Sequence, residues 1–468
     1  MSIMFWDLTL LAIFVVAISI FLYLERKKIK REGLLLLYHT QWGVKLIESF
    51  GEKHKKSLKV LSYFSVFMGY ALMALMIYFF AEVLRVYVFR PDIVSAIKVP
   101  PITPLIPYLP QIFQLNFLPP LYFSYWIIIL AIVAITHEFF HGIFAKIANV
   151  KTKTTGFGFF PFFFPVFLAA FVSLDEKAMT KRKNFEQRAV LSAGTFANIL
   201  TAILGVIIMA VFFSLSFSPA GVVYNDFAYE IVPLDSINSI NGVLVQNLSY
   251  ELLNNLTNPG EMNTIIVGNL TFLGVKGTVP SFEAVALYYD APALKENLTG
   301  AIISIGGKKI TSYSVLTSEI SKYSPGEQIT VGMYNGIGEY EKEIILGESP
   351  NGNAWLGISF TKPQSSGVMG SIIGFFSSYK EPHVYYSPNF AAAQYFYDLL
   401  WWLVLISFSV ALVNMLPVGI FDGGRFFYLT ILSLTKSKKA AEKAYKISTY
   451  FFLLLLLVLM IFWVAAFL

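Results

Sequence analysis

Residues 121–145 read LYFSYWIIILAIVAITHEFFHGIFA, an apolar stretch long enough for a helix to cross about 30 Å of hydrocarbon. It contains the pattern His-Glu-x-x-His, formed by His137, Glu138 and His141. On a helix the two histidines stand four residues apart, so both imidazoles reach one point, and Glu138 is next to the first of them. An ionisable side chain within a span costs roughly 3 kcal/mol on insertion scales. The pattern therefore predicts a metal site, typically for zinc, within a membrane helix.

The composition of the 468-residue chain is that of a membrane protein, with 56% hydrophobic residues, 14% charged residues and a mean hydropathy of +0.63. Because cysteine is absent, disulfides, thiol catalysis and a cysteine-ligated metal site are excluded. The formal charge of +6 is interpreted as the excess of Lys and Arg that membrane proteins carry in cytosolic loops. We therefore expect a lipid bilayer, and no nucleic acid, as the partner of these charges.

Six apolar stretches are predicted to be transmembrane helices, at about 4–24, 60–84, 121–145, 190–214, 392–416 and 447–468. The first is too long for the apolar core of a signal peptide and is followed by ERKKIKRE, so we expect it to be a true span. Most Lys and Arg residues lie in three connecting loops, 25–58, 146–188 and 425–446. The positive-inside rule then predicts that these loops are cytosolic and that both termini lie outside, in a multi-pass protein of the cell membrane.

The remaining large segment, the insertion 215–391, is predicted to be extracytosolic and alternates short β-type runs with turn signals. Within it, SINGVLVQNLSYELLNNL from Ser239 recurs in the form SIGGKKITSYSVLTSEI from Ser304. Each copy predicts strand, tight turn, strand and short helix, a pattern that resembles a PDZ domain; the alternative is another small β-rich domain. The insertion also holds all four Asn-x-Ser/Thr sequons, which agree with an outer location: Asn247, Asn255, Asn269 and Asn297.

The chain is thus predicted to be a polytopic α-helical membrane protein with an extracytosolic β-rich, PDZ-like insertion. The predicted divisions are two N-terminal spans with a basic cytosolic loop (1–90), a Pro-rich outer loop in which prolines preclude a helix (91–120), the half of the core with the His-Glu-x-x-His helix (121–214), a degenerate PDZ-like repeat (215–285), a PDZ-like domain (286–362), a linker (363–391) and the second half of the core (392–468).

A catalytic zinc needs a third protein ligand beside the two histidines. Asp422, near the cytosolic end of the fifth span, is expected at a similar depth to the histidines, whereas Asp7 and Asp398 lie near the outer ends of their spans. Pro417 and Gly419 would break the helix before Asp422 and let it turn toward the metal. The alternative is a simple helix-ending turn at the membrane surface.

The motifs resemble those of the site-2 protease family of intramembrane zinc metalloproteases, and within it the archaeal-type, PDZ-containing branch. That family pairs His-Glu-x-x-His with an Asn-x-x-Pro-x-x-x-x-Asp-Gly type segment, which NMLPVGIFDG at 414–423 resembles. Segment 169–202 resembles the membrane-associated hairpin and the Ala-Gly-Pro-x-x-Asn helix start that follow the metal helix, although Thr195 stands where proline is usual. The Pro-rich loop and YHTQWGVKLIE at 38–48 also resemble that branch.

This resemblance implies that His137, His141 and Asp422 bind one Zn²⁺ per chain and that Glu138 is the general base. Asn414 is a candidate for stabilising the oxyanion, and Asn198 for contacting substrate or orienting the site. Buried asparagines in spans also bridge helices, which is the alternative for both. Glycine and aromatic residues in 155–167 are expected either to form an edge strand that pairs with unwound substrate or to face lipid.

The function expected from the resemblance is regulated intramembrane proteolysis, the hydrolysis of peptide bonds within transmembrane segments. A transmembrane helix hides its peptide bonds, so the substrates are expected to be membrane proteins already trimmed by another protease. The PDZ-like region is expected to screen the trimmed ends; the alternative is a docking role with no gating. The alternatives are a non-catalytic PDZ-bearing membrane scaffold and a metal transporter. A scaffold would be expected to lack Glu138 or a ligand, and a transporter to carry polar residues on several spans.

Overall fold

The computed structural model describes residues 3–32, 35–90, 94, 105–115, 117–159, 168–258, 260–361, 370–371, 374 and 378–465. The chain divides into two compact units. The first unit contains residues Met1–Val211 and Gln394–Leu468, and the second contains Phe212–Ala393. The predicted linker 363–391 and the Pro-rich loop 91–120 fall partly outside the described residues.

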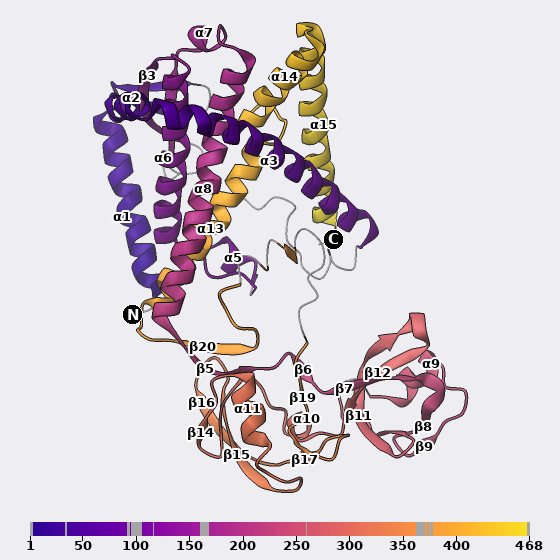
Figure 1. Ribbon diagram of the computed structural model, residues 1–468. Coiled ribbons are helices and arrows are strands. Elements are labelled where there is room, and N and C mark those ends of the chain that lie inside the picture. The colour runs from indigo at the N-terminus through magenta and orange to yellow at the C-terminus, as the bar shows by residue number, and fades with distance from the viewer. Residues whose placement is uncertain are drawn as a thin grey trace. The chain divides into compact units, whose positions relative to one another are not determined.

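Within the described residues, six helices are long and apolar enough to cross a membrane, which confirms the six predicted spans. They are α1 (Ile3–Leu24), α3 (Lys55–Phe89), α6 (Phe123–Ile147), α8 (Asn184–Ser216), α13 (Ala393–Asn414) and α15 (Lys438–Ala465) (Figure 1). Helix α8 continues without a break through Thr195, so the segment that resembled a helix start lies within a helix that begins nine residues before Ala193. The protein is therefore a polytopic helical membrane protein.

Helix α6, which carries both histidines, is surrounded by other elements of the first unit: it packs against α1, α3, the short helix α2 (Val44–Lys53) and a β-sheet (Figure 1). Its first turn is capped by Asp7 of α1, whose carboxylate accepts hydrogen bonds from the backbone N–H groups of Phe123 (2.7 Å) and Ser124 (2.9 Å). Tyr108 donates a third bond to the same carboxylate. Because these N–H groups have no partner within the helix, Asp7 fixes where α6 begins.

A four-stranded antiparallel sheet lies beside α6, in the order β1 (Ile29–Glu32), β2 (Leu35–Thr40), β3 (Thr152–Phe159) and β4 (Leu168–Leu174). The prediction of an edge strand within 155–167 is wrong for the described part of that segment, because β3 pairs on both sides, with β2 and with β4. Residues 160–167 lie outside the described part of the chain. The edge strand of the sheet that packs against α6 is β4.

The three basic connections are largely folded. Segment 25–58 contains β1, β2 and α2; segment 146–188 contains β3, β4 and the one-turn helix α7 (Glu176–Met179); and segment 425–446 is mostly α14 (Asp422–Thr435) and the start of α15. A one-turn helix, α5 (Leu109–Ile112), also forms in the Pro-rich loop, where none was expected. Pro110 occupies its first turn, where the missing N–H is not needed.

The second unit is rich in strands. One six-stranded sheet has the order β7 (Tyr229–Pro233), β12 (Ala284–Tyr289), β11 (Leu270–Val279), β10 (Ile265–Val267), β8 (Ile237–Ile240) and β9 (Val243–Leu244). The other has the order β16 (Glu339–Ile345), β15 (Gln328–Tyr334), β13 (Ala301–Ile305), β5 (Phe217–Val223) and β20 (Val384–Pro388), with β14 (Lys308–Lys309) paired to β13. The second unit also contains two short strand pairs, β17 (Gly347–Glu348) with β18 (Ala354–Trp355) and β19 (Ile358–Ser359) with β6 (Asp226–Phe227). Its α-helices include α9 (Tyr250–Leu256), α10 (Pro292–Lys295) and α11 (Tyr313–Ile320).

The sequence repeat corresponds to two hairpins, each followed by a short helix. Strands β8 and β9 are joined at Asn241-Gly242, β13 and β14 at Gly306-Gly307, and all four turn residues have positive φ, as tight hairpin turns require. Helices α9 and α11 follow, so the strand, turn, strand and helix order is as predicted. The two copies belong to different sheets, and β12 joins the sheet of the first copy. The assignment of either copy as a PDZ domain stays a prediction.

Candidate metal centre

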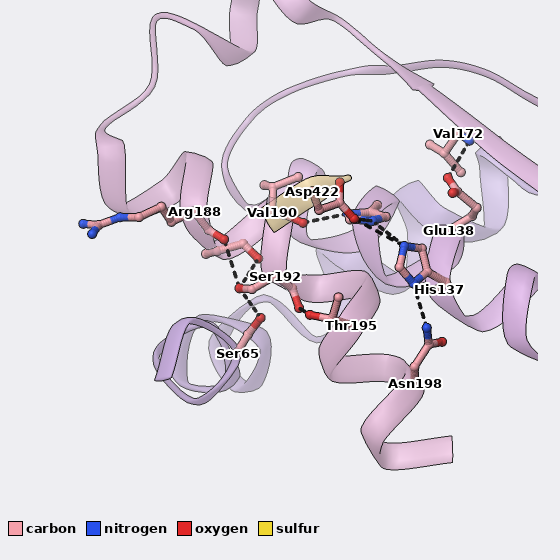
Figure 2. Close-up of polar contacts among 12 residues, drawn as sticks. Ser65, His137, Glu138, Val172, Arg188, Val190, Ser192, Thr195, Asn198 and Asp422 are labelled. Atoms are coloured by element: carbon pink, nitrogen blue, oxygen red, sulfur yellow. Dashed lines mark hydrogen bonds and ion pairs between the residues drawn. The ribbon is translucent and has the colours of Figure 1, made fainter. Parts of the chain in front are cut away.

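Three side chains predicted to bind a metal converge in the first unit. His137 and His141 come from successive turns of α6, and Asp422 is the first residue of α14. The two imidazole Nε2 atoms are 3.0 Å apart, and Asp422 Oδ2 lies 3.5 Å from Nε2 of His137 and 3.2 Å from that of His141. Figure 2 shows the Asp422 carboxylate directed at the histidines. Among the described residues this is the one group of three or more His, Asp or Glu side chains whose ligand atoms lie within 4.8 Å of one another.

A sharp break in the chain brings Asp422 to this position. Helix α13 ends at Asn414 and α14 begins at Asp422, with Pro417 and Gly419 between them, as the sequence predicted. The turn folds back onto the first turn of α14 so closely that a Cβ on Gly423 would lie 2.4 Å from the carbonyl carbon of Met415. A Cβ on Gly424 would lie 2.4 Å from the carbonyl oxygen of Val418. Both positions therefore require glycine, and the two glycines let Asp422 approach the histidines.

One face of α8 lies against both histidines. The backbone carbonyl of Val190 is 2.7 Å from Nδ1 of His141, and the side-chain amide nitrogen of Asn198 is 3.0 Å from Nδ1 of His137. Between them, Gly194 faces the two Nε2 atoms: a Cβ there would lie 2.5 Å from each. Asn198, expected to contact substrate, to orient the site or to bridge helices, is thus a direct neighbour of a predicted ligand (Figure 2).

Glu138 points toward the sheet. Its Oε2 accepts a hydrogen bond of 2.8 Å from the backbone N–H of Val172 in the edge strand β4 (Figure 2). Glu138 and the three predicted ligands line a cavity of about 700 Å³. The same cavity is lined by Asn414 at the end of α13 and by residues of β4, among them Ala170 and Val172. The structure thus brings every predicted site residue except the buried Asn198 to this one cavity.

The other two aspartates considered as third ligands have different surroundings. Asp7 caps α6 through its bonds to Phe123 and Ser124. Asp398 accepts a hydrogen bond of 2.7 Å from Gln394 in the same helix. Asp422 is the aspartate that reaches both histidines.

The donor set fits a zinc ion. Two imidazole nitrogens and one carboxylate oxygen are ligand types that zinc accepts, and three protein ligands are the usual number at a catalytic zinc. The hydrogen-bond acceptor behind His141 Nδ1 is the kind of outer partner that orients zinc-bound histidines. The absence of a side chain on Gly194 keeps the space beside both Nε2 atoms open.

Three contributors to the site were not identified from the sequence. Two are backbone groups, the Val190 carbonyl and the Val172 N–H, which any residue type could supply, so no residue-type signal existed. The third is Gly194, whose role depends on the close approach of α8 to α6. Two signals for it were available: it is the glycine of the stretch 193–198 that resembles Ala-Gly-Pro-x-x-Asn, and it stands midway between Val190 and Asn198, four residues from each, on one helix face.

Helices long and apolar enough to cross a membrane, around a His-His-Asp cluster with an adjacent glutamate, are typical of an integral membrane metallopeptidase. The sequence matches the model of Peptidase family M50 over residues 125–459, well over half of the chain. The chain therefore belongs to this family, the site-2 protease family of intramembrane zinc metallopeptidases. A search of curated proteins found no match to the chain.

Proposed function

We propose that this protein cleaves peptide bonds within the transmembrane segments of other proteins, with one zinc per chain held by His137, His141 and Asp422 and with Glu138 as the general base. The observation that carries the proposal is the convergence of these four side chains, from two helices, on one cavity. The family membership supports an intramembrane metallopeptidase in general terms. The residue roles rest on the geometry described above.

Zinc held by these ligands would supply a Lewis acid that polarises water and the scissile carbonyl. Glu138 accepts the proton of the attacking water and returns it to the amine leaving group. Its carboxylate is held at one oxygen by Val172 N–H, which leaves the other oxygen available for this transfer. Asn414 lines the cavity beside Asp422, and its amide is proposed to donate a hydrogen bond to the carbonyl oxygen as negative charge develops there.

The edge strand β4 is proposed to receive the unwound substrate. A transmembrane helix buries its peptide groups in internal hydrogen bonds, so it must open before hydrolysis. An extended segment can then pair with a free strand edge. Because Val172 N–H points away from β3, the alternation along a strand gives Ala170 N–H the same direction, toward the cavity that holds Glu138. A substrate strand paired with this edge would therefore lie along the cavity that also holds the predicted metal ligands.

The second unit is proposed to lie outside the cell, with the connections 25–58, 146–188 and 425–446 in the cytosol. All four sequon asparagines are exposed, so an outer location would leave each accessible to glycosylation: Asn247, Asn255, Asn269 and Asn297. We further propose that this unit selects substrates already trimmed by another protease. The native chain has no cysteine, so a single cysteine at Ser437 tests the orientation: it should resist an impermeant thiol reagent on intact cells, and labelling there would contradict it.

The test of the proposed chemistry is the variant Glu138→Gln. Glutamine has nearly the same shape but accepts no proton at neutral pH, so cleavage of a model transmembrane substrate should fall by about 10²–10⁴-fold. Zinc content should stay at that of the wild type, because Glu138 is not a proposed ligand. The control is Glu186→Gln at the start of α8, where the carboxylate accepts from the backbone of Lys183. Wild-type turnover by Glu138→Gln with zinc bound would rule out this mechanism.

A further inference from the structure

Helix α8 presents Val190, Gly194 and Asn198 at four-residue intervals, hence on one face. This face meets the two histidines of α6, which are also four residues apart. Val190, the earlier residue on α8, contacts His141, the later residue on α6, and Asn198 contacts His137. The contacts therefore run in opposite order along the two helices. Figure 2 shows Asn198 and Asp422 on opposite sides of the His137 ring. Helix α8 therefore supplies a hydrogen-bonding group behind each imidazole.

The partner of His141 determines which of its nitrogens carries the proton. A backbone carbonyl only accepts hydrogen bonds, so the Nδ1 atom that lies 2.7 Å from the Val190 oxygen must donate. In the neutral ring the lone pair is then on Nε2, the atom that lies 3.2 Å from Asp422. A metal ligand needs its lone pair at this position. Val190 thus prepares His141 for metal binding.

Asn198 occupies the equivalent position behind His137. Its side chain is 0% exposed, and a buried amide without hydrogen bonds is destabilising. Within the described part of the chain, the contact with His137 Nδ1 is the single side-chain hydrogen bond of Asn198, and its oxygen has no donor. The amide is therefore tied to the predicted ligand and to nothing else described there.

We propose that Asn198 is a positioning residue for the metal ligand His137, accepting a hydrogen bond from Nδ1–H through its side-chain oxygen. A rotation of the amide by 180° exchanges its nitrogen and oxygen, which are nearly equal in size, without moving any other atom. With the oxygen toward the ring, Nδ1 carries the proton and the lone pair of Nε2 faces Asp422. Both histidines then have the same tautomer, fixed by one face of α8.

The surroundings of Asn198 favour this role over the two alternatives. Direct contact with a substrate needs access to the cavity, which this buried side chain does not line. A bridge between α6 and α8 exists elsewhere, at Thr201 and Thr136, whose hydroxyl oxygens are 3.5 Å apart. Thr201 follows Asn198 by three residues and hydrogen-bonds to Thr136 and to the Ala197 carbonyl, not to a histidine, so it provides a matched control for helix packing.

The inference rests on the proposed ligand roles and is tested by measuring zinc affinity, through chelator competition, together with cleavage of a transmembrane substrate. Asn198→Leu keeps the size but has no polar group, and should weaken zinc binding by about 10- to 100-fold. Its cleavage should recover when zinc is raised. Asn198→Asp retains an oxygen acceptor and should bind zinc within a few-fold of the wild type. Thr201→Val should leave zinc affinity unchanged.

Three outcomes would overturn the inference. Unchanged zinc affinity in Asn198→Leu with reduced turnover would indicate substrate contact. Equal losses of affinity in Asn198→Leu and Thr201→Val would indicate helix packing. If Asn198→Asp folds but binds zinc as weakly as Asn198→Leu, the amide must donate a hydrogen bond to His137 rather than accept one. If Asn198→Asp does not fold, the comparison of Asn198→Leu with Thr201→Val still decides. Failure of the wild-type protein to bind zinc would instead refute the proposed function.

Discussion

The substitution Gly194→Ala places a methyl group directly between α8 and the two predicted histidine ligands. The added Cβ would lie 2.5 Å from Nε2 of both His137 and His141, about 1 Å closer than ordinary van der Waals contact allows. Metal–ligand distances tolerate only about ±0.2 Å, so a displacement of this size cannot be absorbed within the site. Overpacking of this kind costs about 1–3 kcal/mol. Without zinc the ligands can shift to relieve it, whereas bound zinc holds them in place, so the cost opposes binding and corresponds to roughly 5- to 150-fold weaker affinity.

The assay is zinc retention against graded chelator, with thermal unfolding and cleavage measured on the same samples. Gly205→Ala is the matched control, since it lies on the same helix and gains the same helix propensity. Its Cβ would also make a close contact, with Cγ2 of Val404 at 2.8 Å, but no histidine lies within 4 Å of it, so it overpacks the helix away from the predicted ligands. Zinc affinity should fall in Gly194→Ala only. Equal, wild-type affinity in both variants would refute the close approach of α8 to the metal ligands.

Three further outcomes are expected. Asp422→Ala should lose its bound zinc, because it removes the proposed third ligand. The control Asp398→Asn, at an aspartate that is hydrogen-bonded to Gln394, should keep its zinc. One zinc per chain in Asp422→Ala would exclude Asp422 as the third ligand. Val172→Pro removes the N–H that holds Glu138, at a strand edge where proline is tolerated, so kcat should fall by about tenfold or more with zinc retained. Ala170→Pro instead removes an N–H of the edge proposed to pair with substrate, so it should mainly raise KM. Unchanged kcat in Val172→Pro would show that its bond does not position the base. In the second unit, hydrogen bonds and charge from Lys308 and Lys322 hold the pKa of Glu319 below its usual range. Its stabilisation is therefore complete above the unfolded pKa of about 4.3 and is lost as pH falls through the lower folded value. Thermal unfolding of Glu319→Gln should thus differ from that of the wild type at pH 7 and converge with it in acid, and a difference that persists in acid would contradict this linkage.

The sequence by itself determined the features that depend on neighbouring residues. The spans follow from the length of each apolar run, and the spacing of His137 and His141 follows from the helical repeat. The break before Asp422 follows from Pro417 and Gly419, and the hairpin turns of the second unit follow from Asn241-Gly242 and Gly306-Gly307. In each case the physical cause acts within a few residues, so it can be read from the local pattern.

Only the tertiary structure decided which groups surround the predicted ligands. Asn198 meets a histidine 61 residues away, and Val190 meets one 49 residues away. The interior position of β3 depends on pairing with β2, more than 100 residues earlier in the chain, which is why a free edge was wrongly expected there. The gap at Gly194 and the backbone bonds of Val190 and Val172 exist only because separate elements pack closely. Local periodicity indicates which face of a helix is buried, but the partner of that face depends on how the whole chain packs.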